Sequence, residues 1–136
     1  IVLQRVVPLG EFNDAVVLPD GSELLAASSD RTIHRWSLPS GEQLDPWAGH
    51  VEAVLRLSVH PSGQTVASVD RGGFIQLWYR PTAQSLLTLR TDTNSTCLVF
   101  SEDGERLISA GRIDPVGEVV TFLAQPPHSV PSGKDR

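Results

Sequence analysis

The chain has 136 residues, of which 16 are acidic and 11 basic, and its formal net charge is −5 at pH 7. The length is that of one domain, and the acidic balance disfavours a nucleic-acid partner, which needs a basic face. The single cysteine, Cys97, excludes an intramolecular disulfide framework, and its apolar surroundings predict a buried packing residue. No run approaches the roughly 20 apolar residues of a membrane span, so no membrane partner is predicted.

Short β-type runs follow one another along the chain, separated by Asp, Gly, Pro and Ser. In chain order, the predicted strands are residues 2–9, 12–18, 23–28, 32–38, 42–49, 53–60, 65–69, 74–79, 85–90, 95–100, 106–110 and 118–123. No amphipathic helical stretch of useful length is visible, so the predicted fold class is all-β. The proline- and serine-rich residues 126–136 are predicted to be a disordered tail or a linker.

The chain repeats itself with a period near forty residues. The sequences PDGSELLAASSDRTIHRW, residues 19–36, and PSGQTVASVDRGGFIQLW, residues 61–78, align without a gap at an offset of 42 residues. A weaker third copy spans residues 102–122, and its turn glycine, Gly104, lies 41 residues after Gly63. Self-similarity at such a period predicts a repeat architecture.

These features resemble the WD40 repeat family. Gly49 and His50 precede a β-run and a proline-x-glycine turn, as in that family, and Trp36 and Trp78 match the tryptophan of its third strand, strand c. The aspartate that usually follows this tryptophan is replaced in both copies.

The resemblance implies a β-propeller in which each period forms one four-stranded antiparallel blade, with strands a to d from the inside outward. The implied boundaries are 1–9 for the outer strand of a preceding or closing blade, 10–48 for blade one, 49–90 for blade two and 91–125 for blade three. Three blades are fewer than the about four to eight of closed propellers. The chain is therefore expected to be an incomplete propeller, completed by blades of the same longer chain or by a homo-oligomer.

The family also carries a hydrogen-bonded set of aspartate, histidine, serine or threonine, and tryptophan in its blades, which gives the buried ring N–H groups partners. The matching residues are Asp30 and Trp36 in blade one, with Ser28, and His50, Ser68 and Trp78 in blade two. Gly72 stands where the aspartate of blade two is expected, and whether Asp70 replaces it is left open. Trp47 lies on a predicted outer strand and is expected to contribute far less to the core than Trp78.

No catalytic residue, metal site or cofactor is predicted. His34, His50, His60 and His128 do not have a metal-ligand spacing, and His34 and His60 are expected at the surface or at a blade edge. The sequence has no GxSxG, Walker or GxGxxG motif.

The resemblance implies a non-enzymatic scaffold that binds a protein or peptide with the loops between strands d and a and between strands b and c. The residues at these positions are Arg31, Val51, Glu52, Arg71, Asn94, Arg112 and Asp114. Arginine pairs well with acidic or aromatic partner groups, although for each single residue the favoured alternative is that it only solvates its loop. The alternative is a regulatory or sensor propeller segment of a larger multidomain enzyme, such as a bacterial kinase or protease. A cytoplasmic location is favoured.

Overall fold

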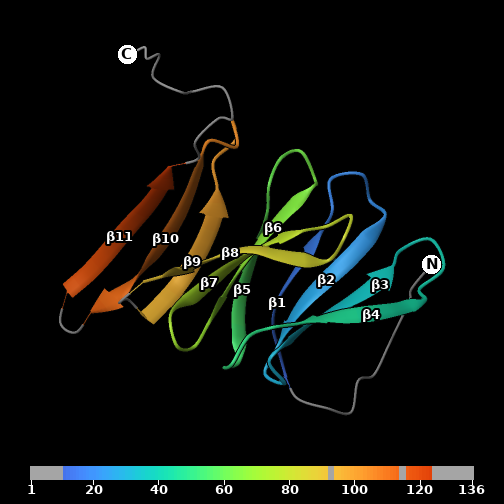
Figure 1. Cartoon of the computed structure of the whole chain (residues 1–136), viewed down its shortest axis with the longest axis horizontal. Helices are drawn as coiled ribbons and strands as arrows, with labels where there is room; N and C mark the ends of the chain where they lie inside the picture. The colour runs from blue at the N-terminus through green and yellow to red at the C-terminus, as the bar shows by residue number, and fades with distance from the viewer. Residues whose placement is uncertain (1–10, 92–93, 114–115, 124–136) are drawn as a thin grey trace.

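The computed structural model describes residues 11–91, 94–113 and 116–123, which form three antiparallel β-sheets arranged side by side (Figure 1). Every strand pairs with the strand that follows it within its sheet. The predicted outer strand in residues 1–9 and the predicted tail at 126–136 lie outside the described residues. In the described part of the chain, no helix is long and apolar enough to cross a membrane.

The three sheets are called blade one, blade two and blade three. Blade one contains β1 (Phe12–Val17), β2 (Glu23–Ser28), β3 (Thr32–Ser37) and β4 (Gln43–Ala48). Blade two contains β5 (Val54–Val59), β6 (Thr65–Asp70), β7 (Phe74–Tyr79) and β8 (Gln84–Arg90). Blade three contains β9 (Asn94–Phe100), β10 (Arg106–Ile113) and β11 (Val116–Leu123). The all-β prediction is confirmed, and each predicted run beyond residue 9 forms a strand; the blade boundaries themselves stay predictions.

The first turn of each blade shows why the sequence repeats. Gly21, Gly63 and Gly104 have φ angles of 74°, 76° and 75°. Each glycine N–H donates to the carbonyl three residues earlier, from Leu18, His60 and Ser101 respectively. Residues with a Cβ adopt this left-handed conformation at a cost, so a glycine is needed where the chain turns from strand a to strand b.

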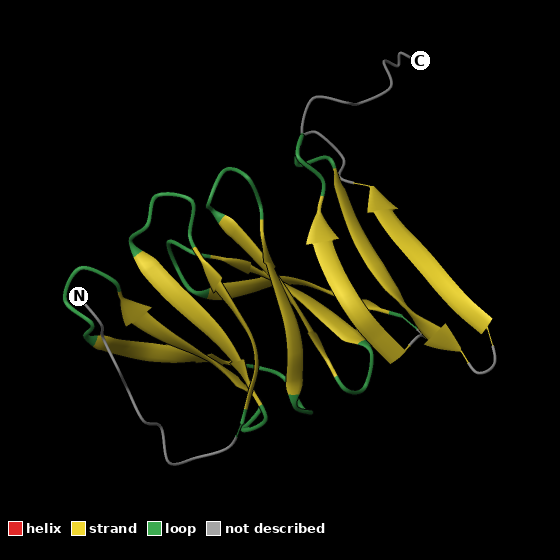
Figure 2. Ribbon diagram, turned by 180° about the vertical axis from the view of Figure 1, so that it is seen from behind, coloured by secondary structure: helices red, strands yellow, loops and turns green. Residues whose placement is uncertain are grey.

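Figure 2 shows the three sheets side by side, and the core lies between them. One buried cluster joins blades one and two, with Leu25 and Ile33 on one side and Val54 and Val66 on the other. A second cluster joins blades two and three and includes Val69, Ile75, Leu98 and Leu107. In blade two, strands b and c are buried on both faces over most of their length, which accounts for their nearly continuous apolar sequence.

Hydrogen bonds between blades fix their relative position. The Leu57 N–H of blade two donates to Asp14 Oδ2 of blade one at 2.9 Å. The Asn13 side-chain amide donates to the Val54 carbonyl at 2.8 Å. The second interface has a similar bond, in which the Phe100 N–H donates to Ser58 Oγ at 2.9 Å.

Three sequence-based expectations about burial are wrong. Trp47 is on an outer strand as predicted, but it is only 3% exposed because its indole stacks on Trp78, with ring centroids 5.5 Å apart. His34 is buried rather than at the surface, since its ring packs between Phe12 and Trp36. Cys97 is exposed, because strand alternation turns its neighbour Leu98 into the core and Cys97 to the face away from blade two.

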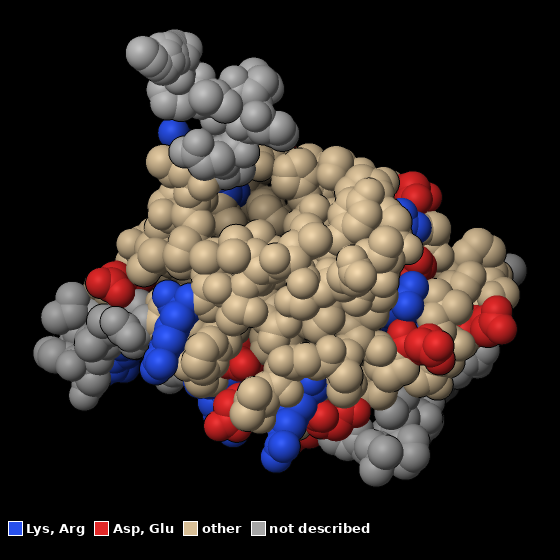
Figure 3. All heavy atoms as spheres, viewed as in Figure 1, with Lys and Arg blue, Asp and Glu red and all other residues tan. Residues whose placement is uncertain are grey.

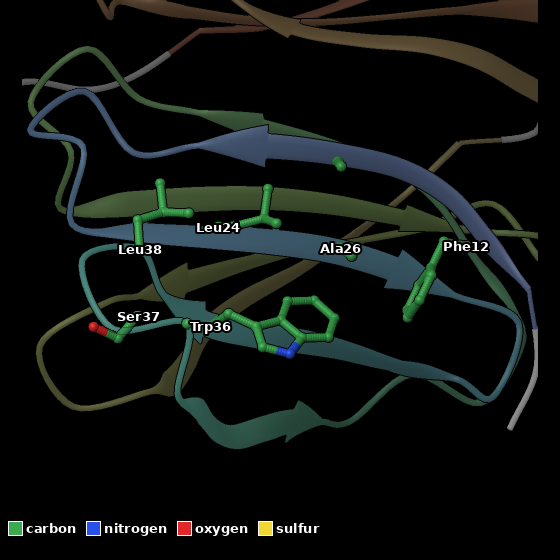
Figure 4. A pocket seen from close by; sticks show the side chains of 8 residues that line it. Phe12, Leu24, Ala26, Trp36, Ser37 and Leu38 are labelled. Carbon is green, nitrogen blue, oxygen red and sulfur yellow. The ribbon is translucent and has the colours of Figure 1, made fainter. Parts of the chain in front are cut away.

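The free side of blade one shows that the propeller is incomplete. A pocket of about 250 Å³ lies there, lined by Phe12, Leu24, Ala26 and Trp36 among others (Figure 4). These residues stand 42 positions before Val54, Val66, Ser68 and Trp78, of which Val54, Val66 and Trp78 belong to the buried cluster between blades one and two. The repeat thus builds the same inter-blade surface twice, and within the described residues only the second copy is covered by a blade.

Candidate protein-binding face

Blade two contains a buried hydrogen-bond network, which lies close to the loop before β5 and the turn after β6. His50 Nδ1 lies 2.9 Å from Asp70 Oδ2, and His50 Nε2 lies 2.6 Å from Ser68 Oγ. Trp78 Nε1 donates to the same Ser68 oxygen at 2.8 Å. A carboxylate only accepts, so the His50 Nδ1–H donates to Asp70 and the Ser68 hydroxyl donates to Nε2. The network therefore gives every one of its polar side-chain groups a partner.

Asp70 completes this network from a position two residues earlier than the family pattern suggests. Its Oδ1 atom accepts the backbone N–H groups of Gly72 at 2.9 Å and of Phe74 at 3.1 Å. One carboxylate thus holds both the histidine and the turn between β6 and β7. The question that the sequence left open is answered, and Gly72 contributes only its backbone.

The protonation state of His50 follows from its surroundings. Burial lowers the pKa of His50 below its ordinary value of 6.5, although the hydrogen bond and the charge of Asp70 oppose this shift. The imidazole is consequently neutral at pH 7. A neutral ring with its proton on Nδ1 is the form that can donate to Asp70 and accept from Ser68 at once.

Blade one uses a different arrangement at the corresponding turn. Asp30 Oδ1 accepts from the backbone N–H and the hydroxyl of Thr32, at 3.0 and 2.7 Å. Asp30 Oδ2 lies 2.7 Å from His34 Nε2. Burial raises the pKa of Asp30, but the hydrogen bonds from Thr32 and His34 outweigh it and hold the pKa below its usual value. Asp30 therefore fixes the β2–β3 turn as Asp70 fixes the β6–β7 turn.

The tryptophan of blade one is not part of a four-residue network. Ala26 stands at the repeat position of Ser68, and Trp36 Nε1 has no hydrogen-bond partner among the described residues. Ser28, the hydroxyl that the sequence offered for this set, does not bond to Trp36, and it accepts the N–H of Asp30 at 3.1 Å instead.

The loops at this end of the blades form the candidate binding face, called the loop face below. The turns between β2 and β3 and between β6 and β7, together with the connection from β4 to β5, lie along the lower side of the view in Figure 1. Their exposed side chains are Arg31, Val51, Glu52 and Arg71. Val51 is 75% exposed and so presents an apolar side chain among charges. In Figure 3, which has the same view, charged side chains gather along the lower edge and the right side of the molecule, and the middle region is uncharged.

The backbone of this face is held in place by specific contacts. The Arg71 N–H donates to the Ala53 carbonyl at 2.9 Å, which ties the β6–β7 turn to the neighbouring loop. The Thr91 N–H donates to the Gly73 carbonyl at 2.9 Å, which extends this tie to the next loop. Arg31 has a φ of 77°, a conformation that glycine supplies at the same turn position, Gly73, in blade two. The loop side chains thus project from a fixed frame.

The remaining predicted residues belong to blade three. Arg112 is exposed near the end of β10, and its backbone pairs with that of Asn94 at the start of β9. Asp114 lies outside the described residues. Sequence reasoning missed Arg90, whose guanidinium lies 5.0 Å from the centre of the Phe74 ring beside the β6–β7 turn. Its place at the last residue of an outer strand, next to a loop of this face, is the signal that could have identified it.

The chemistry available to the network is limited by burial. Ser68, His50 and Asp70 have the residue types and spacings of a nucleophile, base and orienting acid. However, Ser68 is 0% exposed and its oxygen already accepts the Trp78 N–H, so a substrate could not reach it. Within the described ranges, no group of three or more His, Cys, Asp or Glu residues could hold a metal ion.

Residues 41–79, from the turn before β4 to the end of β7, match the WD domain, G-beta repeat family. The chain belongs to the WD40 repeat family. Its three sheets superpose on the crystal structure of the RRP9 WD40 repeats with a TM-score of 0.71 and 29% identity, covering 78% of this chain and 34% of that one. The structure of U3-55K gives a TM-score of 0.72 with 26% identity, covering 89% of this WD40 chain and 41% of that chain.

Curated WD40 relatives include subunits of larger assemblies. Eukaryotic translation initiation factor 3 subunit I of Neurospora crassa is 32% identical over 105 residues, which cover 76% of this chain and 30% of the relative. WD repeat-containing protein 36 of Homo sapiens is 37% identical over 83 residues, covering 60% of this chain and 9% of the relative. The chain spans about a third of the length of the initiation factor subunits it matches.

Proposed function

We propose that this chain is a non-enzymatic segment of a WD40 scaffold that binds a protein or peptide through its loop face. The observation that carries the proposal is the fixed loop frame, from which Arg31, Val51, Glu52 and Arg71 project into solvent. A pre-formed surface loses little conformational entropy on binding, which favours recognition of a partner. Exposed Arg112 extends this surface onto blade three, and Asn94 and Asp114 are proposed as part of it from the sequence.

The names of relatives support a role in assembly. The Neurospora crassa relative is a subunit of a translation initiation factor, and a Caenorhabditis elegans relative is transcription initiation factor TFIID subunit 5. The buried state of Ser68 supports the non-enzymatic assignment, because the only arrangement resembling a catalytic triad among the described residues is closed to a substrate.

The loop face presents cations next to an exposed apolar residue. Arg31 and Arg71 suit carboxylate or aromatic groups, and Val51 offers an exposed apolar contact on the same face. We therefore infer that the partner presents acidic residues beside an apolar one.

The test compares captured proteins between variants of the full chain. Charge reversal by Arg31→Glu and Arg71→Glu together should remove the specific captured proteins from a pull-down analysed by quantitative mass spectrometry. The control reverses two exposed charges at the opposite end of the blades, Glu42→Arg and Glu105→Arg, and should leave capture unchanged. Both variants should melt at the wild-type temperature. The same set of proteins on all three chains would mean that the loop arginines only solvate their turns.

A further inference from the structure

The β2–β3 turn of blade one holds an arginine in a backbone conformation that suits glycine. Arg31 has a φ of 77°, a left-handed conformation that costs free energy in a residue with a Cβ. Blade two has Gly73 at the same turn position, with a φ of 84°. The sequence of blade one therefore keeps a long side chain at a position where the repeat shows that glycine fits.

Hydrogen bonds around Asp30 hold the turn in this conformation. Asp30 Oδ1 accepts from the backbone N–H and the hydroxyl of Thr32, and Asp30 Oδ2 lies 2.7 Å from His34 Nε2. The Arg31 N–H donates to the Ser28 carbonyl at 3.2 Å. A strained residue persists where its surroundings fix it, and these contacts also fix the direction in which the Arg31 side chain leaves the turn.

Within the described part of the chain, the Arg31 guanidinium has no partner that offsets the cost of its conformation. The side chain is exposed, and it has no hydrogen bond, ion pair or ring contact with any described residue. The carboxylate next to it in the sequence, that of Asp30, bonds to Thr32 and His34 instead. The contacts that could repay the cost therefore have to come from outside these residues.

A charge that only solvates the turn does not require position 31. Arg71 shows the alternative in blade two, because it lies two residues before Gly73 and its φ is not in the left-handed region. Ser29 stands at the repeat position of Arg71 in blade one. An arginine at position 29 would put the same charge on the same turn without the left-handed conformation. The direction of the side chain, and not its charge alone, accounts for the placement of Arg31.

We propose that Arg31 determines the specificity of the loop face by binding one carboxylate of a partner segment in a bidentate pair. A guanidinium presents two parallel N–H groups that match the two oxygens of a carboxylate, so the direction of its side chain matters more than that of a lysine. Arg71 adds positive charge to the face but does not select the geometry of the partner. Since the carboxylate belongs to the partner of the proposed function, this role of Arg31 rests on that function.

Peptide selection supplies defined probes for the test. A phage-displayed library of random dodecapeptides is selected on the wild-type chain and depleted on Arg31→Glu with Arg71→Glu, so that the remaining peptides bind the loop face. They should carry Asp or Glu beside an apolar residue. Each enriched peptide is synthesised with a fluorescein label as the acidic probe, and its twin has Asn or Gln in place of the acidic residue. Fluorescence anisotropy gives the affinities, and the acidic probe should bind the wild type more tightly than its twin.

A variant that moves the arginine separates direction from charge. Ser29→Arg with Arg31→Gly keeps the net charge and gives the turn the arrangement of blade two, so it should melt at or above the wild-type temperature. It should weaken binding of the acidic probe by about tenfold or more, whereas Ser29→Arg alone should leave this binding unchanged. Arg31→Lys should weaken it by about three- to fivefold and Arg71→Lys by about twofold or less, because only Arg31 needs the guanidinium fork.

Ala83 provides the control for the relief of strain. It is the other described non-glycine residue with a positive φ, 59°, and its turn between β7 and β8 lies at the end of blade two opposite the β6–β7 turn. Ala83→Gly and Arg31→Gly should both raise the melting temperature, but only Arg31→Gly should lose binding of the acidic probe. A lower melting temperature of Arg31→Gly would remove the premise that the arginine is kept at a cost, and with it the proposal.

The role of Arg31 and the proposed function fail in different ways. Wild-type affinity of the variant with the moved arginine, or equal affinity of the acidic probe and its twin for the wild type, would overturn the role of Arg31. The proposed function would then still stand, because the selected peptides bind the loop face. A selection that yields no peptide sensitive to Arg31→Glu with Arg71→Glu would overturn both.

Discussion

Replacing Trp47 by alanine is expected to destabilise the chain almost as much as replacing Trp78. The two indoles are 3% and 2% exposed and stack on each other across the interface between blades one and two. Truncating a buried tryptophan costs about 3–5 kcal/mol, and the lost aromatic pair contributes about 0.5–1.5 kcal/mol of stability beyond the buried area. Trp78→Ala additionally removes the N–H donor to Ser68, which costs about 1 kcal/mol.

Urea denaturation of the wild type, Trp47→Ala and Trp78→Ala provides the measurement. The free energy of unfolding should fall by about 3–5 kcal/mol for Trp47→Ala and by about 1 kcal/mol more for Trp78→Ala. If either alanine variant does not fold, Trp47→Phe and Trp78→Phe give the same comparison with smaller losses. A Trp47 variant within about 1 kcal/mol of the wild type would refute the inter-blade stack, since surface substitutions usually have effects of that size or less.

Three further predictions concern the network of blade two, its β6–β7 turn and the matching β2–β3 turn of blade one. Because burial lowers the pKa of His50 in the folded chain, the unfolded chain binds the extra proton, so stability is complete above about pH 6.5 and declines as the pH falls below that value. Urea midpoints between about pH 5 and 8 should show this decline in the wild type and a smaller one in His50→Gln; equal slopes would contradict the assignment. Gly73→Ala should lower the free energy of unfolding by more than the roughly 1–2 kcal/mol that a left-handed conformation costs a residue with a Cβ, because the added methyl group would meet the Thr91 carbonyl. Arg31→Gly, at the same turn position of blade one, should instead raise the free energy of unfolding by about 0.5–1 kcal/mol. A lower stability of this variant in thermal or urea melts would show that the arginine side chain stabilises its turn.

The sequence was sufficient for the architecture because turns and strands are encoded locally. The glycines at 21, 63 and 104 mark the same left-handed turn, and strands of apolar residues follow each of them. An insertion in the third copy, which obscures its periodicity, was absorbed by longer β10 and β11 strands. Packing between blades was harder to predict, because it depends on which residues of two distant strands meet. Trp47 has a polar sequence environment typical of an outer strand, yet the side chain that decides its burial is Trp78.

The hydrogen-bond network of blade two shows that sequence position alone does not identify its members. The family pattern places the carboxylate at position 72, but the physical requirement is only that an acceptor reaches His50 Nδ1 and the turn N–H groups. Asp70 meets both requirements from the end of β6. Conversely, Ser28 lies near Trp36 in the sequence, but its hydroxyl accepts a backbone N–H of the turn. The Trp36 N–H therefore has no hydrogen-bond partner among the described residues. Side-chain reach, rather than residue spacing, decides which residues join such a network.

The two interfaces between neighbouring blades differ in how they are packed. The first is filled by the Trp47 and Trp78 stack and closed by Arg35, so it fixes blade one against blade two and with them the loops that carry Arg31 and Arg71. Among the described residues, the second interface has smaller side chains and no ion pair over them, so its apolar lining is open there. Apolar surface of this kind costs about 25 cal/mol for each Å² left in water, and a repeat that already encodes a filled alternative could remove that cost by substitution. Leu77 and Leu89 stand where the first interface has Arg35 and Trp47, so the repeat keeps the strands of the second interface but not the side chains that fill and cover the first.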